Sequence, residues 1–466
     1  MIPDRNNNRV TGVDFSIKYI EQHPMRYYLL MHLLRFTFEN HRSFRDEATL
    51  DLTRSTLSTL RPPKGTTWVD HIHHVDGIYG ANASGKTNVL DALHYVIGAI
   101  GGSATSWLDR PSFLRKPFVL DTDSATALSS FELEFIHDNE RYQYRFTTDS
   151  DGIVEEELHT VNVRWKKIFS RSSKGHVSGL SGVRLVAPRE LALSRAAQLN
   201  IAAVKPLWQG ITRGFDIYRV GDREISERID RIARQLHDRT LSLNELVTLA
   251  QIADTGITHI EVEEQALPPA IAKLVTQMIN KLPEDSVEDD DGQQDSPEDT
   301  EQLSKFIARN LLFRHGIGSG KLRESEESTG TMAWLALGTA VVNALRHGQV
   351  LVVDELGSSL HPQLSHLIID WFEDPTINKA GAQLIFTSHD MTLLDVGRGD
   401  REKREQVWFV EKGADGASEL FNLSDFPLQK GSNIVKQYLE GQFGGLPYTV
   451  PSLVYNLLNT HSTEEK

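Results

Sequence analysis

Apolar positions along the chain follow two patterns, one typical of strands and one typical of helices. Short apolar runs predict strands at residues 33–38, 48–52, 75–79, 131–136, 141–147, 154–163, 350–353, 383–387 and 407–410. Longer runs with helical spacing predict helices at residues 89–97, 331–345 and 362–372. The runs between 131 and 163 follow one another without a helix, which favours an antiparallel sheet. Helices separate the later strands, which favours a parallel sheet, so the pattern predicts an α/β fold.

The middle of the chain differs from both ends. Residues 187–281 show a helical pattern that Gly and Pro interrupt, and no heptad repeat continues long enough for a coiled coil. Residues 282–304 contain ten acidic residues and no Lys or Arg. Because such a composition buries little apolar surface, we expect a disordered acidic linker there.

Composition excludes several classes of site. The 466 residues include no Cys, which excludes disulfides, thiolate zinc sites and a Cys nucleophile, and which is typical of a reducing compartment. Apolar runs are shorter than a membrane span and the first residues have no apolar signal core, so we expect a cytoplasmic protein without a membrane partner. The net charge of −15 does not call for a nucleic-acid partner, although a local basic patch would be compatible with it.

The strand at 75–79 and the helix that follows flank the strongest motif in the chain. The spacing GxxxxGK[ST] is met by Gly80, Ala81, Asn82, Ala83, Ser84, Gly85, Lys86 and Thr87. The glycines let successive backbone N–H groups turn toward one anion, and the helix N-terminus adds partial positive charge. We therefore expect ATP here, with Lys86 neutralising the β- and γ-phosphates and the Thr87 hydroxyl ligating Mg²⁺.

Polar residues follow two apolar strands in the second half of the chain. Asp354 and Glu355 end the strand at 350–353, and the carboxyl ends of parallel strands line the ligand crevice of such sheets. We expect Asp354 to hold Mg²⁺ through water and Glu355 to orient and activate the attacking water. His389, after the strand at 383–387, can place a donor on the γ-phosphate or on that water.

A Ser-x-Gly turn precedes the helix at 331–345. Ser328 and Gly330 are either a plain N-cap or a second anion-binding device. A chain with both a phosphate loop and this turn could use both on one nucleotide only if the two come from different copies. ATP would then lie between the phosphate loop of one subunit and the Ser-x-Gly turn of the other.

Together these motifs resemble the ABC-type ATPase heads of the SMC, RecF and OLD group. The turn Asn40-His41-Arg42-Ser43-Phe44 resembles the Asn-Phe-Arg/Lys-Ser-Phe turn of their first lobe, with His41 in place of Phe. The chain is more similar still to the abortive-infection AAA ATPases of the AbiLi/RloA type from phage-defence loci. Their phosphate loop, acidic motif and C-terminal motifs resemble residues 78–86, 354–362, 409–412, 423–426 and 438–447.

The resemblance implies a fold and a division of the chain. It implies an ABC-type P-loop ATPase head with a mixed or parallel sheet, helical crossovers, an antiparallel lobe and a helical insertion. We expect an N-terminal extension, a first ATPase lobe, a helical insertion, an acidic linker, a second ATPase lobe and a C-terminal tail at residues 1–27, 28–186, 187–281, 282–304, 305–447 and 448–466.

The resemblance also implies roles for individual residues. Ser328 and Gly330 would reach a neighbour's γ-phosphate, and His389 would sense it. Asn40 and Arg42 would contact nucleotide. The Q-loop glutamine of the family has no counterpart that the sequence identifies, Gln143 being a candidate on position alone.

The implied activity is that of a Mg-dependent ATPase that forms a homodimer or higher homo-oligomer around ATP. In defence against phage, such a head would act as a sensor or scaffold with a separate effector, either a nuclease or an RloB-like protein. A DNA-repair or DNA-remodelling ATPase of the RecF/SMC type is the alternative. A fused TOPRIM nuclease is disfavoured because only 77 residues follow His389, and Glu355 argues against a protein that scarcely hydrolyses ATP.

Three histidines lie close together near the phosphate loop, namely His71, His73 and His74. They could bind a metal, but carboxylate or cysteine partners at a fixed spacing are missing nearby. We therefore interpret them as a surface cluster.

Overall fold

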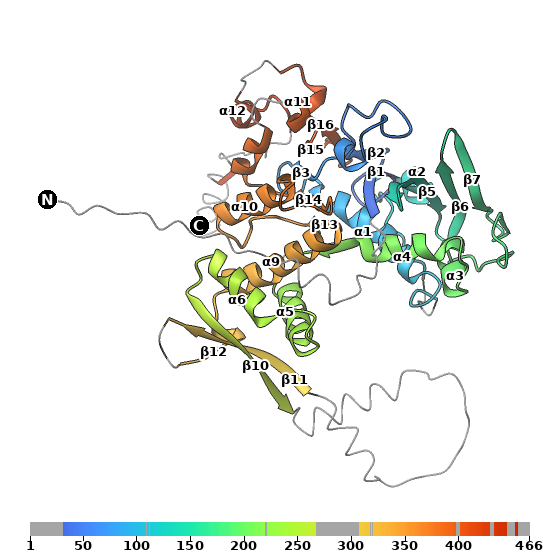
Figure 1. The fold of residues 1–466 in the computed structure, drawn as a ribbon. Helices are drawn as coiled ribbons and strands as arrows, with labels where there is room; N and C mark the ends of the chain where they lie inside the picture. The colour runs from blue at the N-terminus through green and yellow to red at the C-terminus, as the bar shows by residue number, and fades with distance from the viewer. Residues whose placement is uncertain are drawn as a thin grey trace, which may run out of the picture.

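The structure is a computed structural model with an α/β core (Figure 1). It describes residues 31–266 except 109, 111 and 220, residues 307–444 except 317, 319, 398–400 and 429–432, and residues 453–454. The expected N-terminal extension and acidic linker, and most of the expected C-terminal tail, lie outside these residues. Within the described ranges, no helix is both long and apolar enough to cross a membrane.

A six-stranded sheet forms the centre of the fold, in the order β16-β15-β3-β14-β13-β9. Its strands are β3 (Val75–Tyr79), β9 (Phe215–Tyr218), β13 (Val350–Val353), β14 (Gln383–Thr387), β15 (Val407–Lys412) and β16 (Ser418–Asn422). All neighbours are parallel except β15 and β16. β3, β13 and β14 are buried along their whole length, as expected of parallel strands that are covered on both faces. The predicted α/β class with a mixed, mostly parallel sheet is confirmed.

Helices cover both faces of this sheet (Figure 1). α1 (Lys86–Gly102) packs on one face, and α9 (Thr329–His347) and α10 (Pro362–Glu373) pack on the other. The other described helices are α2 (Thr122–Thr126), α3 (Ala192–Gln198), α4 (Lys205–Gly214), α5 (Asp222–His237), α6 (Leu243–Ile252), α11 (Arg401–Arg404) and α12 (Ile434–Leu439). α1, α9 and α10 contain the three helical patterns that the sequence predicts.

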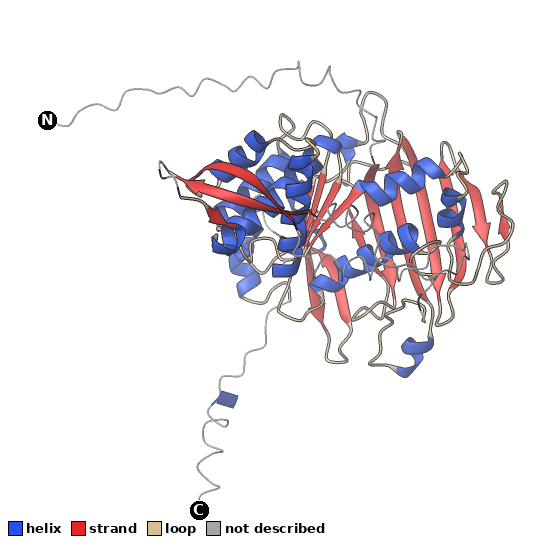
Figure 2. Ribbon diagram, turned by 90° about the horizontal axis from the view of Figure 1, so that it is seen from below, coloured by secondary structure: helices blue, strands red, loops and turns tan. Residues whose placement is uncertain are grey.

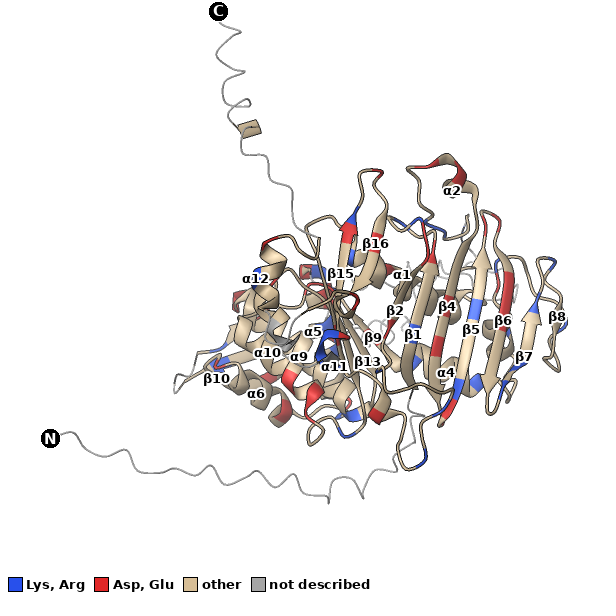
Figure 3. Cartoon of the chain, turned by 90° about the horizontal axis from the view of Figure 1, so that it is seen from above, with Lys and Arg blue, Asp and Glu red and all other residues tan. Residues whose placement is uncertain are grey.

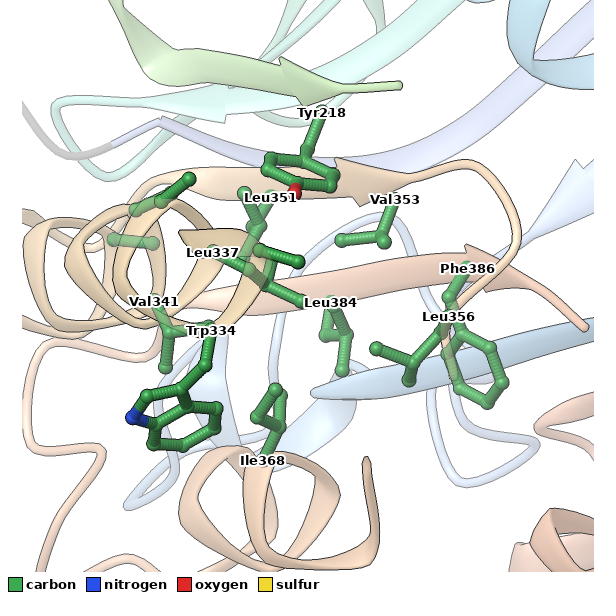
Figure 4. Packing of buried hydrophobic residues seen from close by; sticks show 14 of the residues in the cluster. Tyr218, Trp334, Leu337, Val341, Leu351, Val353, Leu356, Ile368, Leu384 and Phe386 are labelled. Atoms are coloured by element: carbon green, nitrogen blue, oxygen red, sulfur yellow. The ribbon is translucent and has the colours of Figure 1, made fainter. Parts of the chain in front are cut away.

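Alternate residues of β13 enter two separate hydrophobic cores, because successive side chains of a strand point to opposite faces. Leu351 and Val353 belong to the core that α9 and α10 cover (Figure 4). Val350 and Val352 belong to the core that α1 covers. Within the first core, the indole N–H of Trp334 on α9 donates to the backbone oxygen of Leu249 on α6, at 2.6 Å. The strand that carries Asp354 and Glu355 at its end is thus fixed from both sides.

A seven-stranded antiparallel sheet packs beside the centre, in the order β2-β1-β4-β5-β6-β7-β8 (Figure 2). Its strands are β1 (Met31–Glu39), β2 (Ala48–Asp51), β4 (Ser129–His137), β5 (Glu140–Thr148), β6 (Ile153–Val161), β7 (Trp165–Arg171) and β8 (Val177–Ser178). Acidic and basic residues are interspersed across these strands (Figure 3). Glu157 of β6, for example, pairs with Arg145 of β5 and Lys167 of β7. The predicted antiparallel lobe is confirmed.

The helical pattern expected over residues 187–281 is wrong at two places. β9 joins the central sheet, and residues 257–266 form β10 (Ile257–Ala266) in a separate antiparallel sheet with β11 (Ile307–His315) and β12 (Leu322–Arg323). With four residues, β9 is too short to show a period. In β10, Ile260 and Val262 alternate with Glu261 and Glu263, which is a strand pattern that the surrounding helical segments obscured.

The histidines near the phosphate loop do not form a surface cluster, as we had interpreted them. His71 and His73 are buried, with 7% and 1% of their surface exposed. Nδ1 of His73 lies 3.2 Å from Asp76 Oδ1 on β3, and Nε2 lies 3.7 Å from Glu405 Oε2. Burial alone would lower the pKa of His73, but the two carboxylates outweigh burial and raise this pKa to about 9. His73 is therefore a buried, ion-paired residue next to the start of β3.

This raised pKa predicts a pH dependence of stability. A histidine whose pKa is higher in the folded chain stabilises fully below pH 6.5, and the stabilisation is lost as the pH rises through about 9. The free energy of unfolding of the wild type should fall over this interval, and that of His73→Gln should fall less. Urea denaturation at pH 6.5 and 9.5 measures both slopes. Equal slopes would show that His73 is neutral in the folded chain.

Candidate functional site

The phosphate loop joins β3 to α1, as the sequence predicts. α1 begins at Lys86, and the ammonium of Lys86 donates to the backbone oxygens of Gly80 at 2.8 Å and Ala81 at 3.0 Å. Gly85, the N-cap of α1, has a φ of 118°, which L side chains rarely adopt. The loop therefore curves around the side chain that is expected to neutralise phosphate.

Gly85 also allows three segments to meet closely. A Cβ atom at Gly85 would lie 2.5 Å from Ser418 Oγ and 2.7 Å from Ser43 Oγ. The Ser418 hydroxyl donates to the backbone oxygen of Ser84, and Asn88 Nδ2 donates to Ser43 Oγ at 2.7 Å. The turn of the first lobe, strand β16 and the phosphate loop are thus held together by small hydroxyl side chains.

Asp354 brings the two distant motifs into contact. The Thr87 hydroxyl donates to Asp354 Oδ1 at 3.0 Å, across 267 positions of sequence. Thr387, at the end of β14, donates to the same oxygen at 2.7 Å and accepts from the backbone N–H of Glu355 at 2.7 Å. Thr387 is a positioning residue that the sequence analysis missed, although its place immediately before Ser388 and His389 could have indicated it.

The backbone at Glu355 is strained in a way that suits a reactive position. Glu355 has a φ of 58°, in the left-handed region that is costly for a residue with a Cβ atom. Burial lowers the pKa of Lys86, while the charges of Glu355 and Asp354 act in the opposite direction. The ammonium and the two carboxylates are therefore electrostatic neighbours.

His389 lies at the same edge of the sheet. Its neighbour Ser388 is buried, and the backbone N–H of Ser388 donates to the backbone oxygen of Ile78 on β3, at 3.1 Å. The Ser388 hydroxyl donates to the backbone oxygen of Leu356 at 3.0 Å. These bonds fix the backbone before His389 against both β3 and the acidic motif, and the His389 side chain is exposed.

The Ser-x-Gly turn lies on the surface at the start of α9. Ser328 is the N-cap of α9, and its Oγ accepts from the backbone N–H of Thr331 at 3.0 Å. Ser328 and Gly330 are both exposed, and a Cβ atom at Gly330 would lie 3.5 Å from the backbone oxygen of Ser359. Among the described residues, no hydrogen bond joins this turn to residues 80–87. The turn is thus available to a second molecule.

Asn40 connects the first lobe to residues 118–128 through its side-chain amide. Its side chain is buried, and its Nδ2 donates to the backbone oxygens of Ser124 at 2.7 Å, Ala127 at 3.1 Å and Leu128 at 3.2 Å. The side-chain oxygen Oδ1 of Asn40 accepts a hydrogen bond from the backbone N–H of Phe118 at 2.8 Å. Asn40 thus ties residues 118–128 to the first lobe, and because these bonds use its amide donors, we expect a structural role rather than the nucleotide contact.

Removing this amide should therefore affect stability and leave nucleotide binding intact. Asn40→Ala leaves several buried backbone groups unpaired, which should lower the free energy of unfolding by about 2–4 kcal/mol. Urea denaturation measures the loss, and a nucleotide titration well below the unfolding transition should give the wild-type affinity. A normal stability with lost affinity would restore Asn40 to the nucleotide site.

Arg42 is placed at the site by an ion pair. Its guanidinium makes two bonds to the carboxylate of Asp91 on α1, at 2.5 and 3.0 Å. Nε2 of His41 lies 2.9 Å from the same carboxylate, which explains why His rather than Phe stands there. Arg42 also lines a pocket of about 200 Å³ together with Thr87 and Asp354.

The Q-loop candidate lies elsewhere. The Gln143 amide donates to Glu132 Oε1 at 2.8 Å, between neighbouring strands of the antiparallel sheet and away from the phosphate loop.

Asp91 on α1 is a residue that the sequence analysis missed. Its pKa is held well below its usual range, since the bonds from His41 and Arg42 outweigh burial, which alone would raise it. Its position one turn after Thr87 on α1 was the available signal.

Comparison with known proteins identifies one family. The model of a family described as "AAA domain, putative AbiEii toxin, Type IV TA system" matches residues 77–199 and 215–395. A comparison with curated proteins found no match.

Three solved structures are among those similar to this chain. An SMC head bound to the C-terminal winged-helix domain of ScpA has a TM-score of 0.43 and 14% identity, over 84% of this chain and 97% of that one. The recombination mediator RecF with ATP has a TM-score of 0.36 and 13% identity, over 86% and 100%. Stu0660 of Streptococcus thermophilus has a TM-score of 0.33 and 10% identity, over 92% and 94%.

The family match spans the phosphate loop, the Ser-x-Gly turn, the acidic motif and His389, which includes most of the residues that form the site. The match covers more than half of the chain, and the chain therefore belongs to this family of AAA domains.

Proposed function

We propose that the protein binds and hydrolyses ATP with Mg²⁺ and that two copies close around the nucleotide. The observation that carries this proposal is the bond between Thr87 and Asp354, which joins the phosphate loop to the acidic motif. A hydroxyl and a carboxylate side by side at a phosphate loop are the oxygen ligands that Mg²⁺ prefers. The residues present therefore fit the metal and the triphosphate.

Each group at this edge has a distinct task in the proposal. Bound Mg²⁺ supplies positive charge at the phosphates, where Thr87 and Asp354 would hold it. The Lys86 ammonium would exchange its bonds to the loop carbonyls for the β- and γ-phosphates. Glu355 would accept a proton from the attacking water, and His389 would donate a hydrogen bond to the γ-phosphate.

A second copy would complete the site through the turn at Ser328. The exposed N-terminus of α9 offers a hydroxyl, backbone N–H groups and the positive end of the helix dipole. Because no bond joins this turn to the phosphate loop within the described part of the chain, the turn would serve the nucleotide of its partner. The division into two ATPase lobes at residues 28–186 and 305–447 remains part of this proposal.

Ser328→Arg tests the partner's contribution. The long side chain should prevent closure, so that ATP-dependent dimers disappear and hydrolysis falls at least about tenfold, while each single chain still binds ATP. Sedimentation with and without ATP, together with a nucleotide titration, separates these effects. Ser226→Arg, on the exposed face of α5, is the matched control. Normal dimers and turnover in Ser328→Arg would remove the turn from the interface.

We further propose that this ATPase serves in cytoplasmic defence against phage, with a separate effector. The family description, which names an AbiEii toxin, supports this role. Cells that carry the gene with its neighbouring genes should resist phage infection, and cells with the Glu355→Gln variant should not. If both strains are equally sensitive while duplex DNA stimulates the ATPase, the DNA-repair alternative would replace the defence role.

A further inference from the structure

Arg219 stands at the carboxyl edge of the central sheet, directly beside the acidic motif. β9 is the edge strand next to β13, and the two run parallel with Tyr218 opposite Val353. The backbone N–H of Asp354 donates to the backbone oxygen of Tyr218 at 2.9 Å. The residue after β9 is therefore fixed next to the residue after β13.

The charges around Arg219 do not balance. Asp91 Oδ1 lies 3.8 Å from Arg219 Nη2, and the same carboxylate already accepts from Arg42 and Lys116. Three cations thus share one carboxylate. The nearby His94 accepts a hydrogen bond from Arg219 and brings no negative charge, and burial and the Arg219 charge lower its pKa. Asp354 adds a second carboxylate at the same pocket, so three cations face two carboxylates, and this excess of positive charge favours an anion here.

The pocket of about 200 Å³ connects this charge to the proposed metal ligands. Arg219, Arg42, Thr87 and Asp354 all line it. Arg42 is fixed by two short bonds to Asp91, whereas the Arg219 side chain is 47% exposed and lies at a longer distance from that carboxylate. Arg219 is therefore the guanidinium in this pocket that is most free to turn toward a ligand.

We propose that Arg219 contacts the terminal phosphate of the ATP held by its own chain. This inference rests on the proposed ATPase function and adds a residue that distinguishes ATP from ADP. The paired N–H groups of a guanidinium can bind two oxygens of one phosphate, and ADP lacks the γ-phosphate that Arg219 would bind.

The affinities for ATP and ADP test this assignment. In a background that carries Glu355→Gln, Arg219→Gln should raise the Kd for Mg·ATP about tenfold and change the Kd for Mg·ADP by less than about twofold. Arg219→Lys should recover part of the ATP affinity, since lysine keeps the positive charge but cannot bind two phosphate oxygens through paired N–H groups. Arg223→Gln, a fully solvated arginine on α5, is the matched control and should change neither constant.

Other outcomes would overturn the assignment in recognisable ways. If Arg219 only supports Asp91, both constants should rise by the same factor and the melting temperature should fall. If the pocket takes free inorganic phosphate, Arg219→Gln should weaken product inhibition by phosphate and leave both nucleotide constants unchanged. If the chain with Arg219 intact binds neither nucleotide, the ATPase proposal itself fails, so the two failures are distinguishable.

Discussion

Glu355→Gln should stop turnover and leave ATP bound. The amide keeps the size of the side chain but cannot accept a proton from water, so the rate of hydrolysis should fall by about 100- to 10,000-fold. Binding should persist, because the loop at residues 80–87 is untouched. ATP should then hold two copies together, and dimers or larger assemblies should accumulate.

Two measurements check this result. Phosphate release gives the turnover, and sedimentation with Mg·ATP gives the assembly state. Glu155→Gln, an exposed position on β6, should behave as the wild type in both. Equal turnover in the wild type and Glu355→Gln would show that Glu355 does not take part in the reaction. Its left-handed backbone conformation would then have no catalytic explanation.

Lys86→Ala should abolish nucleotide binding. The Lys86 ammonium donates to two backbone carbonyl oxygens inside the loop. A bound triphosphate would take the place of these oxygens as its hydrogen-bond acceptor. Loss of this cation should weaken ATP binding by at least about 100-fold, since charge-assisted bonds to two phosphates are lost together. Calorimetric titration with Mg·ATP measures the change.

Lys379→Ala, at an exposed turn after α10, is the matched control for this variant. It should bind ATP as the wild type does. Retained ATP binding by Lys86→Ala, in a chain that melts at the normal temperature, would refute the assignment of residues 80–87 as the nucleotide loop.

Sequence patterns predicted the parts of the fold that have strong local signals. β13 is a continuous apolar run, β14 has an apolar centre, and α9 is a 19-residue helix whose sequence is mostly apolar. The phosphate loop is a single local motif whose glycines have a physical reason. Because parallel strands share a carboxyl edge, the encounter of Thr87 with Asp354 also followed from the predicted topology.

Tertiary contacts decided what the sequence could not. β9 has too few residues for a period, and its place in the sheet comes from pairing with β13. Asn40 was expected to contact nucleotide from its place in a motif, yet its side-chain amide bonds to the backbone of residues 118–128. The sequence suggested that His73 belongs to a solvated cluster, because its ion-pair partner Glu405 is 332 positions away in the chain.

The central claim is that the phosphate loop and the acidic motif hold one metal-bound triphosphate and that a second copy closes over it. An experimental structure of Glu355→Gln with Mg·ATP tests this most directly. We expect the metal between Thr87 and Asp354, and the γ-phosphate beside Ser328 of the other copy. A triphosphate bound away from residues 80–87, or one enclosed by a single chain alone, would contradict the account.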